Sequence, residues 1–421
     1  MLEDGLFDRM SQRNCERLRW KRESGAVRVL CAQPDGDWDQ ASTIFREVEL
    51  APVTLAFARG GHERLDFVWR AETGMRLVCA VHSTELGPGS GGLRRHDLVV
   101  PERELVRDAL NLSRAMTCKQ AAAGLKRGGS KLCLQSPGVP EYGRDRYLSV
   151  LAEEIDLSGT LTGPDTGLPP SVFEALAVRS PNVTCCGSGV QAASHGVRAA
   201  IGATAAALGA PLSELHLGLQ GLGALGLPLA RKLITEVSKL SVTDTNHHRI
   251  DLLTSSLNPD ERERLQIVPP YQIGELALDI FVPCALGALI TEERIPKLRV
   301  RAICGGANNI LAADSLGEEL TLARWLLEAG ILFVPDWLSS AGAAIHAATQ
   351  LAEGVNFDES HARAKVLRHC GGTVDQILSE ARQTAHAPLE IAVRELLLPR
   401  GLRCAREALG SARTSEAGPA R

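Results

Sequence analysis

Large aromatic side chains are scarce in this chain. Trp, Tyr and Phe together make up 4% of its 421 residues, although 44% of the residues are hydrophobic. A composition rich in alanine, leucine and glycine favours helices packed on sheets over a β-sandwich filled by large side chains. The length exceeds that of one ordinary domain and suits two.

An excess of charge of one sign is also missing. The formal net charge is −4 and charged residues make up 23% of the chain, which gives no reason to expect nucleic acid or an anionic membrane as a partner. Every apolar stretch is broken by charge or proline within about 12 residues, which is too short for a membrane span. The N-terminal sequence MLEDGLFDRMSQRNCERLRWKR has no apolar core and predicts no secretion signal. We therefore expect a cytoplasmic protein.

The eleven cysteines form no CxxC pair and no Cys/His spacing of the zinc-site kind. We expect a reducing compartment in which they pack as small hydrophobic side chains. Cys118 and Cys133 have no paired base nearby in the sequence, so packing is favoured over a nucleophilic role. The histidines, such as His82 and His346, stand apart from other metal-ligating residue types, and we expect no metal.

The first half of the chain mixes strand and helix patterns. Residues 102–118 carry apolar side chains at helical spacing, with acidic residues early and a basic residue late. Short apolar runs predict strands at 26–32, 53–58, 74–83 and 130–136.

From about residue 190 the pattern changes to a regular alternation of strands and helices. Such alternation predicts a parallel sheet with crossover helices. The expected strands are 215–220, 240–244, 278–285, 300–307 and 331–336. Residues 340–408 are expected to be mostly helical, and the small polar residues 411–421 to be disordered.

A GxGxxG motif follows the first of these strands and opens a helix. Its glycines are Gly221, Gly223 and Gly226. Asp244 lies 23 positions after the first glycine, at the end of the next strand, which is the spacing of a dinucleotide site. A carboxylate there would accept from ribose hydroxyls and repel a 2′-phosphate, which favours NAD, although the nearby Arg249 weakens the argument. The alternative is a tight strand-to-helix turn without a ligand.

Proline interrupts the expected helix after this motif. We expect Pro228 in its second turn, where proline costs about 3 kcal/mol or produces a kink.

The segment KQAAAGLKRGGSK (119–131) places Lys119, Lys126 and Lys131 among alanines and glycines. A charged lysine can hold a carboxylate, and a desolvated lysine beside another cation can act as an acid or base near neutral pH. Asp165, in LTGPDTGLPPS, lies in a turn with little side-chain bulk. It is either an acid–base group or a turn acceptor.

Together these segments resemble the glutamate/leucine/phenylalanine/valine class of amino acid dehydrogenases. The similarity runs from about residue 74 to 400, and the motifs are most like those of phenylalanine and leucine dehydrogenase. The matching segments are HSTELGPGSGG (82–92), AMTCKQAAAGLKRGGSK (115–131), TGPDTG (162–167), LQGLGALG (219–226), DIFVPCALGALIT (279–291), GGANNIL (305–311) and VPDWLSSAGAAIHAA (334–348).

The resemblance implies an α/β fold of two domains. An N-terminal α/β substrate domain and a Rossmann-type NAD-binding domain would enclose the active-site cleft between them. Residues 1–190 would bind substrate and oligomerise, with a leader at 1–73 that is not typical of the family, and residues 191–345 would bind NAD. Residues 346–410 would return to the substrate domain. A homo-oligomer is expected.

The same resemblance implies NAD-dependent oxidative deamination of an L-amino acid to a 2-oxo acid and ammonia. By position, Lys119 would bind the substrate carboxylate, Lys131 would activate water, and Asp165 would exchange protons with the substrate nitrogen. Gly87 would present its backbone to the substrate, whereas Lys126 has no matching role.

Cofactor contacts are also implied. Asn308 and Asn309 follow the C-terminal end of a strand, where ligands bind in open α/β sheets, although a turn role is the alternative. The full expected cofactor set is Ser194, Gly221, Gly223, Ala224, Leu225, Gly226, Asp244, Cys284, Ala285, Ala307, Asn308 and Asn309.

Small residues characterise the positions associated with the side-chain pocket, namely Ala344, Ala347, Gly163 and Pro164. They predict a roomy pocket and a bulky apolar or aromatic amino acid, unless they only pack against a bulky neighbour. Ser340 replaces the asparagine that is usual in the family near the substrate. The alternatives are therefore a diverged member acting on a non-protein amino acid or amine, and a catalytically silent NAD-binding protein.

Overall fold

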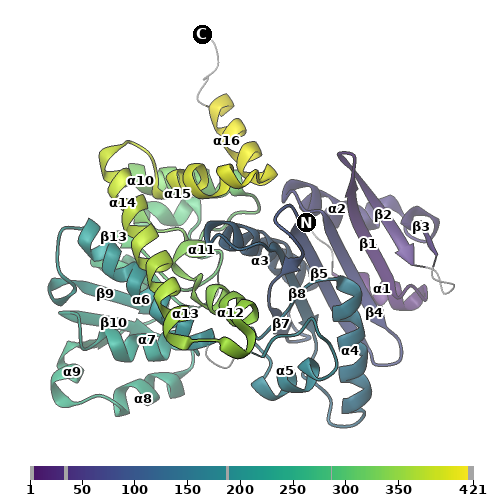
Figure 1. Cartoon of the computed structure of the whole chain (residues 1–421), viewed down its shortest axis with the longest axis horizontal. Helices are drawn as coiled ribbons and strands as arrows, with labels where there is room; N and C mark the ends of the chain where they lie inside the picture. The colour runs from purple at the N-terminus through teal and green to yellow at the C-terminus, as the bar shows by residue number, and fades with distance from the viewer. Residues whose placement is uncertain (1–3, 33–36, 186–188, 286, 416–421) are drawn as a thin grey trace. The chain divides into compact units, whose positions relative to one another are not determined.

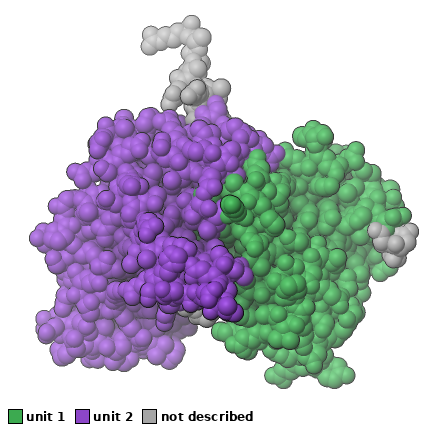
Figure 2. Space-filling view, viewed as in Figure 1, with its two compact units in different colours: residues 1–121, 126–187 green, residues 122–125, 188–421 purple. Residues whose placement is uncertain are grey.

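The computed structural model describes residues 4–32, 37–185, 189–285 and 287–415, with side chains through residue 410. The chain forms two compact units, which are coloured separately in Figure 2. Unit 1 comprises residues 1–121 and 126–187, and unit 2 comprises residues 122–125 and 188–421. The assignment of substrate and cofactor roles to particular stretches of the chain stays a prediction.

Unit 1 is built on one mixed sheet with the strand order β3-β2-β1-β4-β5-β8-β6, and β7 also pairs with β8 (Figure 1). Neighbouring strands from β3 to β8 are antiparallel, whereas β6 and β7 run parallel to β8. The strands are β1 (Arg17–Glu23), β2 (Ala26–Ala32), β3 (Trp38–Gln40), β4 (Arg64–Arg70), β5 (Met75–Ser83), β6 (Gly89–Ser90), β7 (Leu93–His96) and β8 (Gly128–Gln135).

Both faces of this sheet are covered by helices, because its central strands are apolar on both sides. On β5, for example, Leu77 and Cys79 belong to one core, and Val78 and Ala80 to the other. One core includes α1 (Leu6–Gln12), α2 (Glu47–Arg59) and α3 (Glu102–Ala122). The other includes α4 (Arg144–Ser158) and α5 (Pro170–Ala177).

The predicted strand at 53–58 is wrong, because these residues belong to the helix α2. Its buried side chains Leu50, Val53 and Phe57 repeat at helical spacing. Glu49 accepts a hydrogen bond from the backbone N–H of Arg46 (2.8 Å), which closes the first turn. The predicted strand begins after Pro52, so the prediction takes account of neither the helical spacing that begins at Leu50 nor the capping by Glu49. The predicted strands at 26–32, 74–83 and 130–136 and the predicted helix at 102–118 are confirmed.

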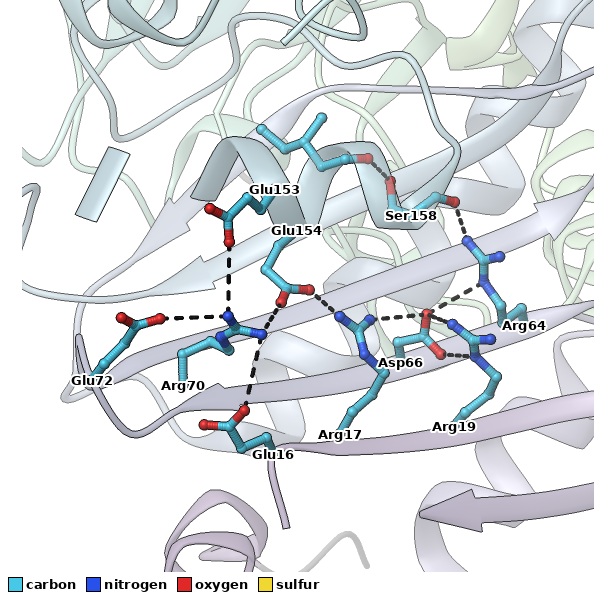
Figure 3. A network of polar contacts seen from close by, with 11 residues as sticks. Glu16, Arg17, Arg19, Arg64, Asp66, Arg70, Glu72, Glu153, Glu154 and Ser158 are labelled. Carbon is cyan, nitrogen blue, oxygen red and sulfur yellow. Dashed lines mark hydrogen bonds and ion pairs between the residues drawn. The ribbon is translucent and has the colours of Figure 1, made fainter. Parts of the chain in front are cut away.

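A network of buried ion pairs joins β1 to the rest of unit 1 (Figure 3). Asp66 on β4 is fully buried, and its carboxylate contacts three guanidinium groups, those of Arg17, Arg19 and Arg64. The bond from Arg19 is bidentate, at 2.6 and 3.0 Å. Glu154 on α4, also buried, bonds Arg17 and, at 3.1 Å, Arg70. The first strand is therefore an integral part of this sheet.

Unit 2 contains a fully parallel sheet of order β11-β10-β9-β12-β13-β14 (Figure 1). Numbered within the unit this is 3-2-1-4-5-6, the order of a Rossmann-type fold. The strands are β9 (His216–Gln220), β10 (Lys239–Thr243), β11 (Leu265–Ile267), β12 (Leu278–Pro283), β13 (Val300–Ile303) and β14 (Leu332–Phe333). All five strands expected in this region are confirmed, with several of them shorter than predicted.

Helices complete unit 2. Those near the sheet are α6 (Gly189–Ala207), α7 (Gly226–Leu233), α8 (His247–Ser255), α9 (Pro259–Arg264), α10 (Leu316–Glu328) and α11 (Asp336–Ser339). The C-terminal helices are α12 (Gly342–Glu353), α13 (Glu359–Leu367), α14 (Val374–Gln383), α15 (Pro388–Ala392) and α16 (Arg403–Ser415). The helices α12 to α14 contact α6, whereas α15 and α16 contact α10. The helix α16 continues to Ser415, so residues 411–415 of the predicted disordered tail are helical, and residues 416–421 lie outside the described residues.

Pro228 does not lie in a second turn as expected. The helix α7 begins at Gly226, so proline is its third residue. The N–H groups of a first turn have no partner within the helix, and proline therefore costs little there.

Within the described ranges, we find no helix that is both long and apolar enough to span a membrane.

Candidate active site

Lys131 and Asp165 meet at one edge of the sheet in unit 1. The Nζ atom of Lys131, on β8, donates a hydrogen bond to Asp165 Oδ2. Asp165 lies in the segment 161–166, which runs beside residues 90–95 through backbone hydrogen bonds such as Leu93 N–H to Gly163 O (3.0 Å). Lys131 is 3% exposed, so the two predicted acid–base residues form a largely buried pair.

Glycine is needed beside this pair. A Cβ atom on Gly92 would lie 3.0 Å from Asp165 Cβ and 3.2 Å from Lys131 Nζ. These separations are shorter than ordinary van der Waals contacts of about 3.5–4.0 Å. Gly92 therefore lets the lysine and the carboxylate approach each other.

Burial lowers the pKa of Lys131 to about 7, from 10.5. Arg94 is the next largest cause, and Lys119 adds to it, because neighbouring cations disfavour the ammonium form. The contact with Asp165 acts in the opposite direction, since a carboxylate favours the ammonium. The arrangement thus holds a lysine whose proton can be lost near neutral pH.

Lys119 lies in the last turn of α3 and is 6% exposed. Lys126, in contrast, is exposed in the connection between α3 and β8. The three lysines of the segment 119–131 are therefore not equivalent: two are buried in unit 1 and one faces solvent.

Two predicted substrate positions in unit 1 are tightly enclosed. Gly87 has a φ of 134°, and a Cβ atom there would lie 2.7 Å from the carbonyl oxygen of Lys126. A Cβ on Gly163 would lie 2.6 Å from Thr184 Oγ1. A side chain at either position would clash with the surrounding chain, whether or not the glycines also contact a substrate.

Sequence reasoning missed two charged residues beside the pair, Arg94 on β7 and Asp108 on α3. Arg94 Nη2 lies 3.4 Å from Asp165 Oδ1, and its Nη1 lies 2.9 Å from Asp108 Oδ2. The alternation along β7 could have drawn attention to Arg94, because Leu93 is apolar and Arg94 points to the opposite face of the sheet. The pairing of β7 with β8 that makes the contact possible could not be read from the sequence.

The predicted cofactor loop in unit 2 lies where the C-terminal ends of β9 and β12 meet. Gly221 has a φ of 96°, and a Cβ atom there would lie 2.8 Å from Ala285 Cβ. The Cβ of Gly223, in contrast, would have Arg249 Nη1 as its nearest neighbour, at 3.9 Å. Space therefore remains beside the start of α7, where a phosphate group would approach the backbone.

Asp244 holds this loop in place. Its Oδ2 accepts a hydrogen bond from the N–H of Leu222 (2.6 Å) and its Oδ1 from that of Asn246 (2.8 Å). Arg249 Nη1 lies 3.5 Å from Oδ2. The carboxylate is nearly buried and fixed at the end of β10.

Several of the other expected cofactor residues of unit 2 lie around the same edge of the sheet. The Cys284 N–H bonds Gln220 O at the end of β9 (2.7 Å), and the N–H of Ala307 bonds Pro283 O (2.9 Å). Leu225 packs against Gly306. Gly226 begins α7, and Ala224, in the turn before it, is exposed. Ser194 is buried on α6.

Asn308 and Asn309 lie next to α11. The N–H of Asn309 bonds Asp336 Oδ2 (2.7 Å), and Ser340 Oγ lies 3.5 Å from Asn308 Oδ1. Ser340 also donates to Asp336 O (2.6 Å). These contacts connect both asparagines to α11, and their role in cofactor binding stays a prediction.

Ala344 and Ala347 are half-buried on α12 in unit 2, whereas Gly163 and Pro164 belong to unit 1. Across the described ranges, no cluster of three or more His, Cys, Asp or Glu side chains is arranged to hold a metal ion.

Known proteins resemble both units. The model for the Glu/Leu/Phe/Val dehydrogenase dimerisation domain matches residues 64–137, and that for glutamate/leucine/phenylalanine/valine dehydrogenase matches residues 240–395. A valine dehydrogenase of Streptomyces albus is 33% identical over 322 residues, which cover 73% of this chain and 84% of that protein. The chain belongs to the Glu/Leu/Phe/Val dehydrogenase family.

Further members of the family agree with this result. A leucine dehydrogenase of Thermoactinomyces intermedius is 30% identical over 340 residues, 75% of this chain and 84% of that protein. The crystal structure of an L-tryptophan dehydrogenase from Nostoc punctiforme has a TM-score of 0.59 at 26% identity, covering 87% of this chain and 98% of that one. Members of the family are oxidoreductases that act on the CH–NH2 group of amino acids and use NAD or NADP.

Proposed function

We propose that this protein catalyses the reversible, NAD-dependent oxidative deamination of a bulky apolar or aromatic L-amino acid. The products are the 2-oxo acid and ammonia. The observation that carries the proposal is the buried contact of Lys131 with Asp165 beside a second buried lysine, Lys119. Membership of the dehydrogenase family supports the same reaction.

Each of these three side chains has a chemical role in the proposal. The ammonium of Lys119 binds the substrate carboxylate and orients Cα. Asp165 first accepts a proton from the substrate ammonium, and loss of hydride from Cα then leaves an iminium carbon. Water adds to this carbon while neutral Lys131 accepts a proton from that water. Asp165 then returns its proton to the substrate nitrogen. The nitrogen leaves as ammonia while the hydroxyl group formed from water loses its remaining proton to solvent and becomes the carbonyl oxygen of the 2-oxo acid. The bound nicotinamide supplies the hydride acceptor.

A pKa near 7 suits Lys131 to this task. A general base works best when its pKa lies near the operating pH, because it is then both unprotonated and basic enough. An ordinary lysine, with a pKa of 10.5, would be almost fully protonated at neutral pH. Burial of Lys131 and the nearby cations remove that obstacle.

NAD is the proposed cofactor rather than NADP. The fixed carboxylate of Asp244 would face the adenosine ribose, accept a hydrogen bond from its hydroxyls and repel a 2′-phosphate. Arg249 offsets only part of the repulsion between Asp244 and a 2′-phosphate. Two backbone N–H groups hold the carboxylate of Asp244 in place, so it does not move toward the guanidinium.

The proposed substrate class is supported by the relatives, which are named for leucine, valine and tryptophan. The small side chains of Ala344 and Ala347, both half-buried on α12, also support a bulky substrate.

A second candidate is a family member with a changed substrate, such as a non-protein amino acid or amine. Ser340 favours it, because its hydroxyl bonds the backbone of its own helix, at Asp336 O, instead of reaching out as the longer asparagine could. Activity on such compounds, combined with none on leucine, valine, phenylalanine or tryptophan, would support this candidate over the first.

We also propose a homo-oligomer, because residues 64–137 match a domain described by its role in dimerisation. Light scattering on the purified protein would measure the mass of the assembly directly, and a single-chain mass would contradict the proposal.

The experiment for the main proposal follows NADH formation at 340 nm with a panel of L-amino acids at alkaline pH. We expect turnover on at least one bulky apolar or aromatic substrate, and the reverse reaction with its 2-oxo acid and ammonia. A folded protein that binds NADH but turns over none of the panel would contradict the proposal.

A further inference from the structure

The side chains around Lys131 and Asp165 are ordered by the strand pairing. In the parallel pair β7–β8, Leu93 lies opposite Leu132 and Arg94 lies opposite Cys133. Alternation along β8 places Lys131 on the same face as Cys133, which belongs to the core against α3. Arg94 and Lys131 therefore project from neighbouring strands toward the same helix, and Asp108 comes from that helix.

The two oxygens of Asp165 have different partners. Oδ1 accepts a hydrogen bond from the backbone N–H of Thr166 (2.6 Å) and lies 3.4 Å from Arg94 Nη2. Oδ2 accepts from Lys131 Nζ. Two donors on one oxygen fix the plane of the carboxylate, so that the other oxygen is directed at the lysine.

Arg94 is itself held. Its Nη1 donates to Asp108 Oδ2 at 2.9 Å, and the side chain is only 12% exposed. His96, two residues along the same strand, places Nε2 3.2 Å from the same oxygen. Burial alone would raise the pKa of Asp108, but the contact with His96 and the charge of Arg94 lower it. Asp108 is therefore a stable anion that anchors the guanidinium.

Charged and titratable groups from several neighbouring elements act on Lys131. Those that favour its neutral form are cations, and those that favour its ammonium form are anions or thiols. The groups are Arg94 on β7, Lys119 and Asp108 on α3, Cys133 on β8 and Asp165 in the segment 161–166.

We propose that Arg94, anchored by Asp108, is a positioning residue of the reaction: it holds one oxygen of Asp165 so that the other faces Lys131 Nζ, and it supplies the positive charge beside the lysine. This inference rests on the proposed function, and it adds a group that acts through Asp165 and Lys131 without contacting the substrate. A guanidinium suits this role because its planar fork can bridge two carboxylates, which a lysine cannot do.

The test compares Arg94→Gln, which removes the charge, with Arg94→Lys, which keeps the charge but loses the bridge. The pH dependence of kcat/KM for amino acid oxidation is measured for each. In Arg94→Gln we expect kcat to fall at least about tenfold, and the ascending limb to move to higher pH by on the order of one unit, because a neighbouring cation no longer disfavours the ammonium. In Arg94→Lys the limb stays near its wild-type position while kcat still falls.

A readout without substrate accompanies the rates. Protein labelled with 13C at the lysine ε-carbon gives a Lys131 resonance, which is identified by its absence in Lys131→Arg. The change of this resonance with pH gives the midpoint of the Lys131 titration directly. We expect this midpoint to rise in Arg94→Gln. The matched control is Lys126→Gln, which removes one charge from an exposed side chain and should change neither the limb nor the midpoint.

The inference would be overturned if Arg94→Gln left both the Lys131 titration midpoint and the ascending limb of kcat/KM unchanged. It would also be overturned if Arg94→Gln and Arg94→Lys lost equal amounts of kcat and neither shifted the pH profile. If the wild-type protein oxidises no amino acid, the proposed function fails, while the titration still decides the effect of Arg94 on Lys131. If Arg94→Gln does not fold, Arg94→Lys and Asp108→Asn carry the test, and an unchanged kcat in both would overturn it.

Discussion

Adding one methyl group beside the acid–base pair tests the geometry of the site. In Gly92→Ala the new Cβ would lie 3.0 Å from Asp165 Cβ, 3.1 Å from Asp165 Oδ2 and 3.2 Å from Lys131 Nζ. Ordinary contacts are about 3.5–4.0 Å, so the pair must open by about 0.5 Å. Since a misplacement of about 1 Å can cost 10²-fold in rate, we expect kcat to fall about tenfold.

Gly89→Ala is the matched control. Its Cβ would meet Ser130 Cβ at 3.0 Å and Thr160 Cγ2 at 3.1 Å, which is the same degree of crowding away from the pair. Neither glycine has a positive φ, so each variant should lose about 1–3 kcal/mol of folding free energy from overpacking. Only Gly92→Ala should also lose rate.

The assay is steady-state NADH formation, with thermal unfolding measured in parallel. Equal kcat values for the two variants would refute the claim that Gly92 makes room for a catalytic contact. A Gly92→Ala variant with wild-type kcat would refute it as well, because the pair could then separate without consequence.

Two further predictions concern stability and cofactor choice. Asp66→Ala should lower the free energy of unfolding by about 3–5 kcal/mol, because it removes the buried carboxylate that three largely buried guanidinium groups share, of which only Arg17 keeps another carboxylate among the described residues, that of Glu154. Denaturant titration measures this loss, and Glu23→Ala, in an exposed ion pair, should change little. Asp244→Asn should reduce the preference for NADH over NADPH by about tenfold or more. Arg249→Ala should increase this preference, because it removes a cation that lies 3.5 Å from the Asp244 carboxylate. Fluorescence titration with both cofactors measures the preference, and shifts in the same direction for both variants would contradict the prediction.

Unit 2 shows why part of the fold was predictable. Its strands β9, β10 and β12 are buried in a parallel sheet, so they read as short apolar runs between helices. The glycine motif also carries its own geometry, since Gly221 has the positive φ that a tight turn requires. Local sequence is enough for such elements.

The N-terminal part of unit 1 was harder to predict. The apolar run at 53–58 fits a strand or a helix equally well when Leu50 and the capping Glu49 are left out. The arginines of β1 look like an ordinary solvated face in the sequence. Their burial depends on Asp66 and Glu154, which are far away along the chain.

The candidate site also contains residues that the sequence predicts and residues that it does not. Lys131 and Asp165 were found through motifs, which need no knowledge of packing. Arg94 and Asp108 were not, because their roles follow from the pairing of β7 with β8 and from the position of α3 over that face. Such long-range pairings are absent from the local pattern.

The most direct test of the account is the pH profile of kcat/KM for wild type, Lys131→Met and Lys126→Met. We expect wild type to gain activity as the pH rises through about 7, because Lys131 must lose its proton to act as a base. Lys126→Met should keep this limb, whereas Lys131→Met should lose it together with at least about 10²-fold of its activity. A Lys131→Met variant with the wild-type limb and rate would contradict the central claim that Lys131 moves the proton.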